Sequence, residues 1–359
     1  MKQFFLRVIL LLPVIPLSAQ SASEKRSFYN SYPVNKDTKL EVINKYGDVK
    51  ISVWDKDSIY ILAEIEAFSP DEGKVRNMIN GVETEFSGTS MLVSARTKIK
   101  EGIIDLTESF KGLTKKVINY ESGVKISYYI NAPAYTEVRI ENQFGDISIE
   151  KNGNIVSATL SNGNFEAGSL NSLPLLKLSF AEAFISSVRS ARMELSFSRV
   201  DVNESEELSI NSTSSRIELE KAGIVATESR RDKFFTGQLD ELKGISYFTD
   251  FRIEALNRGC DATIKYGSLD IASIRNDFRR TEIKSSYSDI YLNFNQSAAF
   301  DFEIRHVNSF VVIPEKNANS RKETVNKDKN EYIITGSVGN TAGAGKVVID
   351  AVKGNIYIR

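Results

Sequence analysis

Residues 193–202 read MELSFSRVDV, and this short stretch decides the fold. The same arrangement of alternating apolar residues around an aromatic or small-residue corner returns as LKLSFAEAFI at 176–185 and INSTSSRIEL at 210–219. The first apolar residue after each corner recurs every 17 or 18 residues. These markers are Ile147, Phe165, Ala183, Val200, Ile217, Phe234, Phe251 and Leu269. Such even spacing indicates a chain that winds into equal turns.

Apolar alternation with a period of two predicts strands with one buried face. A single unit of this length cannot bury that face alone, so successive units must stack. We therefore predict an all-β fold, a parallel β-helix-like solenoid with about 17–18 residues per coil. Roughly eleven coils at a spacing of about 4.8 Å would make a rod on the order of 50 Å long.

The repeat becomes irregular toward the C-terminus. After Leu269 the next markers are Ile290, Phe310 and Ile356, separated by longer steps. The polar run 315–331 is rich in Asn and Lys, and we expect it to form a loop at one edge of the solenoid.

The N-terminal part contains one coil and two insertions. Ser69 as the N-cap, Pro70 at the first helical position and Glu72 at the third are typical of a helix start, and an apolar stripe at helical spacing follows. We therefore predict a short helix at about 70–80 that lies against the sheet or covers the open end of the solenoid. The insertion 100–122 is apolar for a loop; it either folds onto the body or forms a flap that binds a partner. We expect a β-rich segment at 24–135 and the solenoid repeats at 136–359, as one continuous domain.

The first residues have the order of a secretory signal peptide. Lys2 and Arg7 precede an apolar run and then small residues, which predicts a signal peptide at 1–19 with cleavage after Ala19. The only cysteine is Cys260, so no lipid-anchor cysteine stands at the cleavage point and no intrachain disulfide can form. No later run is apolar enough for a membrane span, and we expect a secreted or periplasmic protein. With 46 basic and 47 acidic residues, the charge balance argues against nucleic-acid binding.

The corner phrases resemble a known family. The run 44–49 (NKYGDV) followed by Trp54, its echo at 142–149 (NQFGDISI) and the closing 354–356 (GNI) are similar to secreted bacterial proteins with DUF4097-type β-strand repeats, which are usually labelled putative adhesins and are related to GIN head-domain repeats. The resemblance covers roughly 38–359. It implies a β-solenoid outside the cytoplasm, commonly in Gram-negative bacteria, and it brings no catalytic residues.

Metal and nucleophilic sites have little support. His306, the single histidine, lies at a repeat corner, where a structural or solvated role is more natural than a Ser-His-Asp triad. One His and one Cys cannot supply four zinc ligands, and Cys260 follows a glycine at a turn, as a small, partly buried residue would. We predict no cofactor and no metal.

Acidic residues recur at one register position. Asp48, Asp146, Glu182, Asp250 and Asp289 align there. Between Glu182 and Asp250 the same position holds Arg199, Arg216 and Lys233. Mixed charge of this kind is typical of a solvated face, whereas an acid-base enzyme needs acids that converge on one site. The calcium-binding Gly-Gly-x-Gly-x-Asp repeat is absent.

An aromatic column stands just before the corners. Its members are Tyr46, Phe144, Phe180, Phe197, Phe248, Tyr266 and Tyr287. Because Phe180 and Phe197 are in phase with the inward residues of the preceding strands, we predict that the column points inward and stacks as a core ladder. The alternative is an exposed stripe that binds sugar rings.

These observations favour a non-enzymatic envelope or secreted solenoid that presents a rigid, adhesin-like surface to a protein or glycan partner. The alternatives are a polysaccharide lyase or hydrolase and a structural or envelope-stress component. A groove lined by three or more carboxylates with a basic residue among them would favour the enzyme, and scattered mixed charges would favour binding. The sequence does not identify the ligand.

Overall fold

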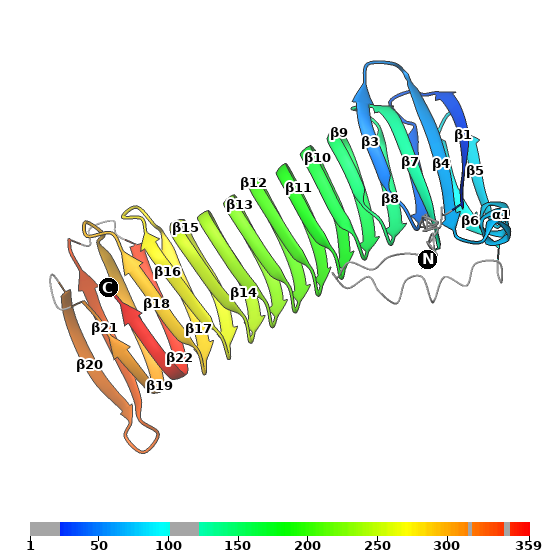
Figure 1. The fold of residues 1–359 in the computed structure, drawn as a ribbon. Coiled ribbons are helices and arrows are strands. Elements are labelled where there is room, and N and C mark those ends of the chain that lie inside the picture. The colour runs from blue at the N-terminus through cyan, green and yellow to red at the C-terminus, as the bar shows by residue number, and fades with distance from the viewer. Residues whose placement is uncertain (1–21, 101–121, 315–317, 341–344) are drawn as a thin grey trace, which may run out of the picture.

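The computed structural model describes residues 22–100, 122–314, 318–340 and 345–359. Its strands form one sheet of 22 strands, wound into a rod of stacked coils with a small antiparallel region at each end (Figure 1). One helix, α1 (Glu72–Asn80), lies at the N-terminal end. The predicted all-β solenoid is confirmed.

The body of the rod consists of long strands that each make almost one coil. They are β9 (Ile147–Ser161), β10 (Asn164–Ser179), β11 (Glu182–Ser196), β12 (Arg199–Thr213), β13 (Arg216–Arg230), β14 (Lys233–Tyr247) and β15 (Asp250–Lys265). Neighbouring strands pair in parallel, with Val200 opposite both Ala183 and Ile217. Both of these partners and Val200 are buried, as the marker positions require.

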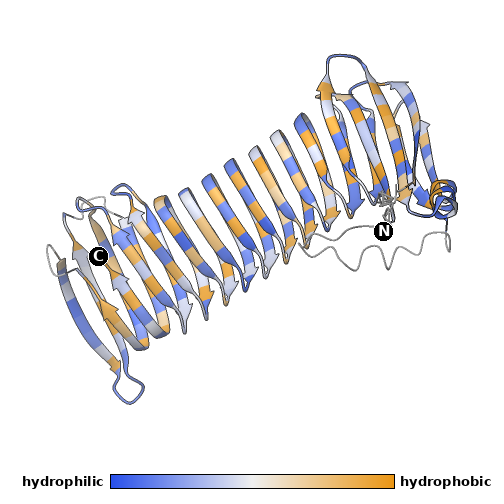
Figure 2. Cartoon of the chain, viewed as in Figure 1, coloured by the Kyte–Doolittle hydropathy of each residue, from blue (hydrophilic) through white to orange (hydrophobic). Residues whose placement is uncertain are grey.

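Each coil has two straight parts and two corners. They are identified by the number of residues between successive inward side chains. In the coil of β12 the buried residues are Val200, Val202, Ser205, Leu208, Ile210, Ser212 and Ser215. Inward positions two apart mark the straight parts, and steps of three mark the corners. We call 199–203 the first straight, 204–206 the wide corner, 207–213 the second straight and 214–215 the left-handed corner, and use the same names for the equivalent residues of other coils. Figure 2 shows the alternation of hydrophobic and hydrophilic residues along the coils.

The left-handed corner is named for its backbone. One residue in each coil has φ between 50° and 65° there. The column runs through Tyr46, Phe144, Asn162, Phe180, Phe197, Ser214, Arg231, Phe248, Tyr266, Tyr287, Lys353 and Asn308. The next residue is small or polar, and in several coils its side chain accepts the corner N–H of the preceding coil: the Ser198 N–H donates to Ser215 Oγ at 3.2 Å and the Ser215 N–H donates to Asp232 Oδ1 at 2.7 Å.

The predicted inward direction of the aromatic column is wrong. Phe180 is 61% exposed and Phe197 is 55% exposed. The positive φ breaks the two-residue alternation, so the aromatic side chain turns outward and the inward position passes to the next residue, Ala181 or Ser198. Tyr46 is the member that is buried.

The N-terminal end continues the stack with strands from both straights. The coil formed by β2 (Lys39–Lys45) and β3 (Val49–Trp54) lies in parallel on β8 (Glu137–Gln143) and β9. Beyond it the first straight continues through β7 (Gly123–Pro133), β4 (Ser58–Ser69) and β1 (Ala22–Pro33), and the second through β6 (Leu92–Ile99) and β5 (Val82–Gly88).

The predicted helix is present as α1 and lies against the sheet at this end, but its N-cap is not the predicted Ser69. The N-cap is Asp71, whose carboxylate accepts from the N–H groups of Gly73 and Lys74. Ser69 instead accepts the Asp71 N–H at 3.1 Å. Val75, Met78 and Ile79 are buried, and the helix packs against β4 and β1.

The C-terminal end is not stacked in chain order. β16 (Ser268–Ile274), β17 (Arg280–Ser286) and β18 (Asp289–Phe294) continue the coils, and the final strand β22 (Gly345–Ile358) pairs next in parallel. Strand β19 (Phe300–Val312) lies on the far side of β22, followed by the antiparallel pair β21 (Glu331–Val338) and β20 (Ala318–Asn326).

Two predictions about this end are therefore corrected. Ile356 stacks on Ile290 rather than after Phe310, and Phe310 is 60% exposed because its neighbour Val311 pairs with Ile356 instead. The run 315–331 was expected to be a loop, yet its described part forms β20 and the turn into β21. Backbone pairing with β21 orders this polar segment although it has no apolar alternation.

Candidate binding surfaces

The exposed aromatic residues of the left-handed corner form a ridge along the rod. The ridge consists of Phe180, Phe197, Phe248, Tyr266 and Tyr287, each 49% exposed or more. Three further exposed apolar side chains, Ile245, Tyr247 and Val352, lie directly beside it in the sequence of the same coils. The ridge and these three neighbours together account for eight of the sixteen exposed large hydrophobic residues of the described chain.

The rings of the ridge stack on one another. The centroids of Phe180 and Phe197 are 5.1 Å apart with an interplanar angle of 3°. Tyr266 stacks on Phe248 at 5.0 Å and on Tyr287 at 5.2 Å. Because the rings stack along the rod, their faces contact each other and their edges point to solvent.

Cations close the ends of the longer stack. The Arg231 guanidinium lies over the Phe248 ring at 5.9 Å. At the other end, Lys353 Nζ lies over the Tyr287 ring at 4.7 Å and donates to Tyr287 Oη at 3.0 Å. These contacts add cation–π stabilisation and leave two positive charges on the ridge.

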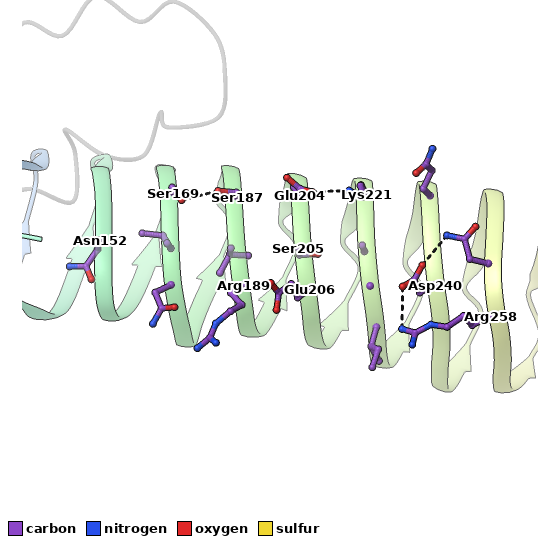
Figure 3. A pocket seen from close by; sticks show the side chains of 18 of the residues that line it. Asn152, Ser169, Ser187, Arg189, Glu204, Ser205, Glu206, Lys221, Asp240 and Arg258 are labelled. Carbon is purple, nitrogen blue, oxygen red and sulfur yellow. Dashed lines mark hydrogen bonds and ion pairs between the residues drawn. The ribbon is translucent and has the colours of Figure 1, made fainter. Parts of the chain in front are cut away.

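A second surface is a trough along the wide corners of β9 to β15, with a volume of about 760 Å³ (Figure 3). At about 4.8 Å per coil, it is on the order of 30 Å long. Its polar lining includes Asn152, Ser169, Asn171, Ser187, Arg189, Glu204, Ser205, Glu206, Lys221, Gln238, Asp240, Asn257 and Arg258.

Contacts between coils hold many of these side chains in place. Lys221 Nζ bonds Glu204 Oε1 at 2.9 Å. Asp240 accepts from Asn257 Nδ2 at 2.9 Å and pairs with Arg258 at 3.1 Å. The trough therefore presents both charge signs in a prearranged pattern.

One trough side chain has an unused hydrogen-bonding group. Ser205 is 6% exposed, and its Oγ has no hydrogen-bond partner. A buried hydroxyl without a partner is costly, and Ser205 is the inward residue of the wide corner, at the place of Leu170 and Val188, so the cost falls on the interior of the coil.

A third surface is an acidic cleft on the first straights near the N-terminal end, with a volume of about 540 Å³. Its charged lining consists of Asp48, Lys50, Asp146, Glu166, Glu182 and Asp201. This lining has three or more carboxylates with a basic residue among them, which is the arrangement expected of an enzyme. The trough, with Glu204, Glu206 and Asp240, meets the same condition.

Two carboxylates of the cleft, Asp48 and Asp146, bond the backbone of a neighbouring coil. Asp48 Oδ1 accepts the Asp146 N–H at 3.0 Å, and Asp146 Oδ1 accepts the Asn164 N–H at 2.8 Å. The Asp48 carboxylate also accepts a hydrogen bond from Lys125, which raises the pKa of that ammonium. Within the described ranges, no three His, Cys, Asp or Glu side chains come together in a way that could hold a metal ion.

The predicted charge register is present in the structure. Glu182, Arg199, Arg216, Lys233 and Asp250 lie opposite one another in successive coils. Their charges are balanced by acidic residues two positions further along the strand as well as by members of the same column. Arg199 pairs with Asp201 at 3.2 Å and with Glu218 at 3.0 Å.

The remaining candidates are structural. His306 on β19 is 4% exposed and stacks on Tyr332 at 5.4 Å, and neither ring nitrogen has a hydrogen-bond partner, so no triad is assembled around it. Burial, aided by Lys322, lowers the pKa of His306. Cys260 is buried, and burial raises the pKa of its thiol to about 12.

Two sequence predictions fall outside the described residues. They are the signal peptide at 1–19 and nearly all of the insertion 100–122. Among the described residues, no helix is long and apolar enough to cross a membrane.

Comparison with known proteins identifies no family for this chain. No family model matches the chain, and no curated protein does. The DUF4097 resemblance therefore stays an expectation from the sequence. Solved structures with matching architecture are a "putative cell adhesion protein" from Clostridium sporogenes, a "putative lipid binding protein" from Parabacteroides distasonis and a "putative adhesin" from Bacteroides fragilis.

The three likenesses are remote. The Clostridium protein is 8% identical, with 93% of this chain and 99% of that chain covered and a TM-score of 0.22. The Parabacteroides protein is 13% identical, with coverages of 76% and 94% and a TM-score of 0.34. The Bacteroides fragilis protein is 12% identical, with coverages of 93% and 97% and a TM-score of 0.24. None of these values carries an argument about a ligand.

Sequence reasoning missed the trough. Its residues occupy the wide corners. There the inward residues of each coil are three apart, but no residue type recurs from coil to coil. Asn152, Leu170, Val188 and Ser205 stand at equivalent places. A search for repeated residue types therefore has no signal there.

Proposed function

We propose that this protein is a secreted or periplasmic, non-enzymatic binding scaffold, adhesin-like in its use of a rigid surface, and that the trough holds an extended glycan. The observation that carries the proposal is the trough itself. It crosses adjacent coils from β9 to β15 on a rigid sheet, and its lining is dominated by Ser, Asn, Gln and charged side chains that hydrogen-bond to hydroxyl groups.

A glycan fits this surface better than an extended peptide does. Peptides commonly bind sheets by adding a strand to a free edge. In β10 to β14 the backbone groups pair with the coils on both sides, so the trough offers no free edge. Recognition there must come from side chains, whose donors and acceptors alternate along the trough.

The test is binding of the purified protein to a panel of glycans and envelope proteins by calorimetry. For a glycan that binds, Arg189→Ala with Glu206→Ala should weaken the affinity by about 30-fold, because the two changes together remove hydrogen bonds worth about 2 kcal/mol. The matched control is Arg192→Ala with Glu194→Ala, which changes the same residue types on the second straight of β11, outside the trough. An equal loss in both double variants would contradict the proposal, and so would binding to proteins alone.

The acidic cleft supports a second candidate, a polysaccharide lyase or hydrolase. Glu166, Glu182 and Asp201 lie on its lining beside Asp48 and Asp146. If this surface is catalytic, the protein should turn over acidic polysaccharides, and Glu166→Gln should abolish turnover while binding persists. Absence of product with any acidic polysaccharide that binds would reject this candidate.

A further inference from the structure

The ridge is a convex apolar edge, which distinguishes it from the trough and the acidic cleft. It follows the left-handed corner from Phe180 to Lys353, and its five rings are about half exposed or more. The rings form two stacked groups, Phe180 with Phe197 and Phe248 with Tyr266 and Tyr287, and the coils of Ser214 and Arg231 lie between them. Exposed aromatic clusters on a soluble protein commonly mark an interaction site.

Positive charge follows the ridge although the whole chain is nearly neutral. The chain has 46 basic and 47 acidic residues. Within two residues of the corner, from the coil of Phe180 to that of Lys353, the cations are Arg199, Arg216, Arg230, Arg231, Lys233, Lys265 and Lys353. The acids in the same span are Glu182, Asp250 and the half-buried Asp289, because Asp232 is buried. Arg199 and Arg216 pair with Glu218, so the excess of positive charge comes from the other five cations.

The stacking of the rings limits what they can bind. A sugar ring packs on the face of an aromatic side chain, but the faces of Phe248, Tyr266 and Tyr287 are taken by each other and by cations. The exposed ring edges carry partial positive charge and apolar C–H groups. A partner for this ridge must offer an apolar layer to the ring edges and negative charge to the flanking cations.

We infer that the ridge docks the protein onto an anionic lipid surface, with the aromatic edges in the headgroup region and the flanking Lys and Arg side chains on lipid phosphates. Aromatic side chains with neighbouring basic residues are typical of protein segments at membrane interfaces. Because the corner recurs once in each coil, stacked ridge side chains of neighbouring coils lie side by side and can meet one surface together. This inference does not depend on a glycan in the trough.

The experiment is flotation of the protein, processed after Ala19, with vesicles of phosphatidylcholine alone and of phosphatidylcholine mixed with phosphatidylglycerol. We expect binding about ten-fold tighter or more to the mixed vesicles, falling as salt rises, because each basic residue near an anionic surface contributes separately. Phe197→Asn with Phe248→Asn should abolish most of this binding. Asn is suited to the corner, since Asn162 occupies the same column at φ 58°.

Matched controls separate docking from general surface effects. Phe184→Asn removes a ring that is 45% exposed on the first straight, away from the ridge, and should leave binding unchanged. Arg231→Gln with Lys233→Gln should weaken binding to mixed vesicles, whereas Arg252→Gln should not. Circular dichroism and thermal melting confirm that each variant is folded.

Three results would overturn the inference. The first is equal binding to both vesicle types or to neither. The second is vesicle binding that the ridge variants leave unchanged. The third is a different occupant: an anionic polysaccharide bound through the same ridge residues in the absence of vesicle binding, or self-association that these variants abolish.

Discussion

At the left-handed corner, one residue in each coil has a backbone conformation that L-residues rarely adopt, and its side-chain type varies widely. Phe197, Ser214 and Arg231 occupy successive coils with φ of 50°, 53° and 59°. The conformation is therefore set by the coil and not by the residue. The inter-coil bonds support it, since the Phe197 N–H donates to Thr213 O and the Ser214 N–H donates to Arg230 O.

The second residue of the left-handed corner must be small in some coils. A Cβ added to Gly163 would lie 2.1 Å from the Gly145 carbonyl oxygen. We expect Gly163→Ala to lower the free energy of unfolding by about 1–3 kcal/mol, because backbone atoms must move to accept it. Urea unfolding measures the loss.

The control for this prediction is Ala181→Ser. Ala181 occupies the equivalent position one coil on, and Ser198 occupies it in the next coil. This substitution should change stability by less than about 1 kcal/mol. Equal losses for both variants would show that the approach of Gly163 to Gly145 is not the cause.

Asp232 places a carboxylate where other coils have a hydroxyl. It is 1% exposed and accepts hydrogen bonds from Ser212 Oγ at 2.7 Å, the Ser215 N–H at 2.7 Å and the Arg230 N–H at 2.9 Å. Burial raises its pKa in spite of these bonds. An acid with a raised folded-state pKa favours folding most when it is protonated, so its contribution to stability falls as pH rises.

Asp232→Ser tests this sign. The variant loses hydrogen bonds at every pH, but it also loses the penalty of a buried charge at high pH. The stability advantage of the wild-type protein over Asp232→Ser should therefore shrink between about pH 3 and pH 7, measured by urea unfolding at each pH. Thr249→Ser, at the equivalent position of the next coil, should show a pH-independent difference. An advantage that grows with pH would refute the assignment.

The sequence predicted which residues stand at equivalent positions of successive coils better than it predicted whether a side chain points inward or outward. The spacing of Val200, Ile217 and Phe234 established the stack because burial repeats with the coil. The direction of Phe180 or Phe197 depends on the sign of φ at a single residue. A period-two pattern carries no information about that sign.

At the scale of elements, the two ends of the rod have polar edge strands. β1 (ASEKRSFYNSYP) is exposed on both faces over most of its length, and β20 (ANSRKETVN) carries Arg321, Lys322 and Glu323. Charged residues on an edge strand discourage pairing with another sheet. These strands therefore stop the solenoid from growing by addition of a second molecule.

Replacing these charges tests the edge. Arg321→Val with Lys322→Val and Glu323→Val should promote self-association through β20, because its outer backbone groups remain unpaired. Light scattering after size-exclusion chromatography measures the change. Lys177→Val with Glu194→Val, on strands paired on both sides, should leave the protein as associated as before. Equal association of both variants would point to general hydrophobicity.

The C-terminal topology explains why element order could not be predicted. Strand β22 stacks between β18 and β19, so a strand near the end of the chain completes the coil contacts of both. Residues 289–294, 309–312 and 354–358 all present the repeat phrase, and each could stack on any other. The choice among them comes from three-dimensional packing, which periodicity does not encode.

At the scale of the whole molecule, each coil of the body contacts its two neighbours, so the rod behaves as a one-dimensional array. Stability is then close to a sum of coil and interface contributions. The ridge, the trough and the charge register also run along the rod, since each is built from equivalent positions of successive coils. A change that preserves the coil should preserve all three.

Removal of one whole coil tests this view. Deletion of residues 199–215 joins Ser198 to Arg216, which stands in the same register position as Arg199. The shortened protein should fold cooperatively, with a modestly lower melting temperature and a rod shorter by about 4.8 Å in X-ray scattering. The deletion also removes Glu204 and Glu206 from the trough and Ser214 from between Phe197 and Arg231, so glycan affinity should fall while vesicle binding through the ridge persists.

The control deletion, 199–207, removes about half a coil. It places the inward residues of the following strand in the wrong register, so they would meet the outward residues of β11. We expect this protein to lose the cooperative transition. If both deletions unfold alike, the coils are not interchangeable units, and the body of the rod is stabilised by contacts beyond those between neighbours.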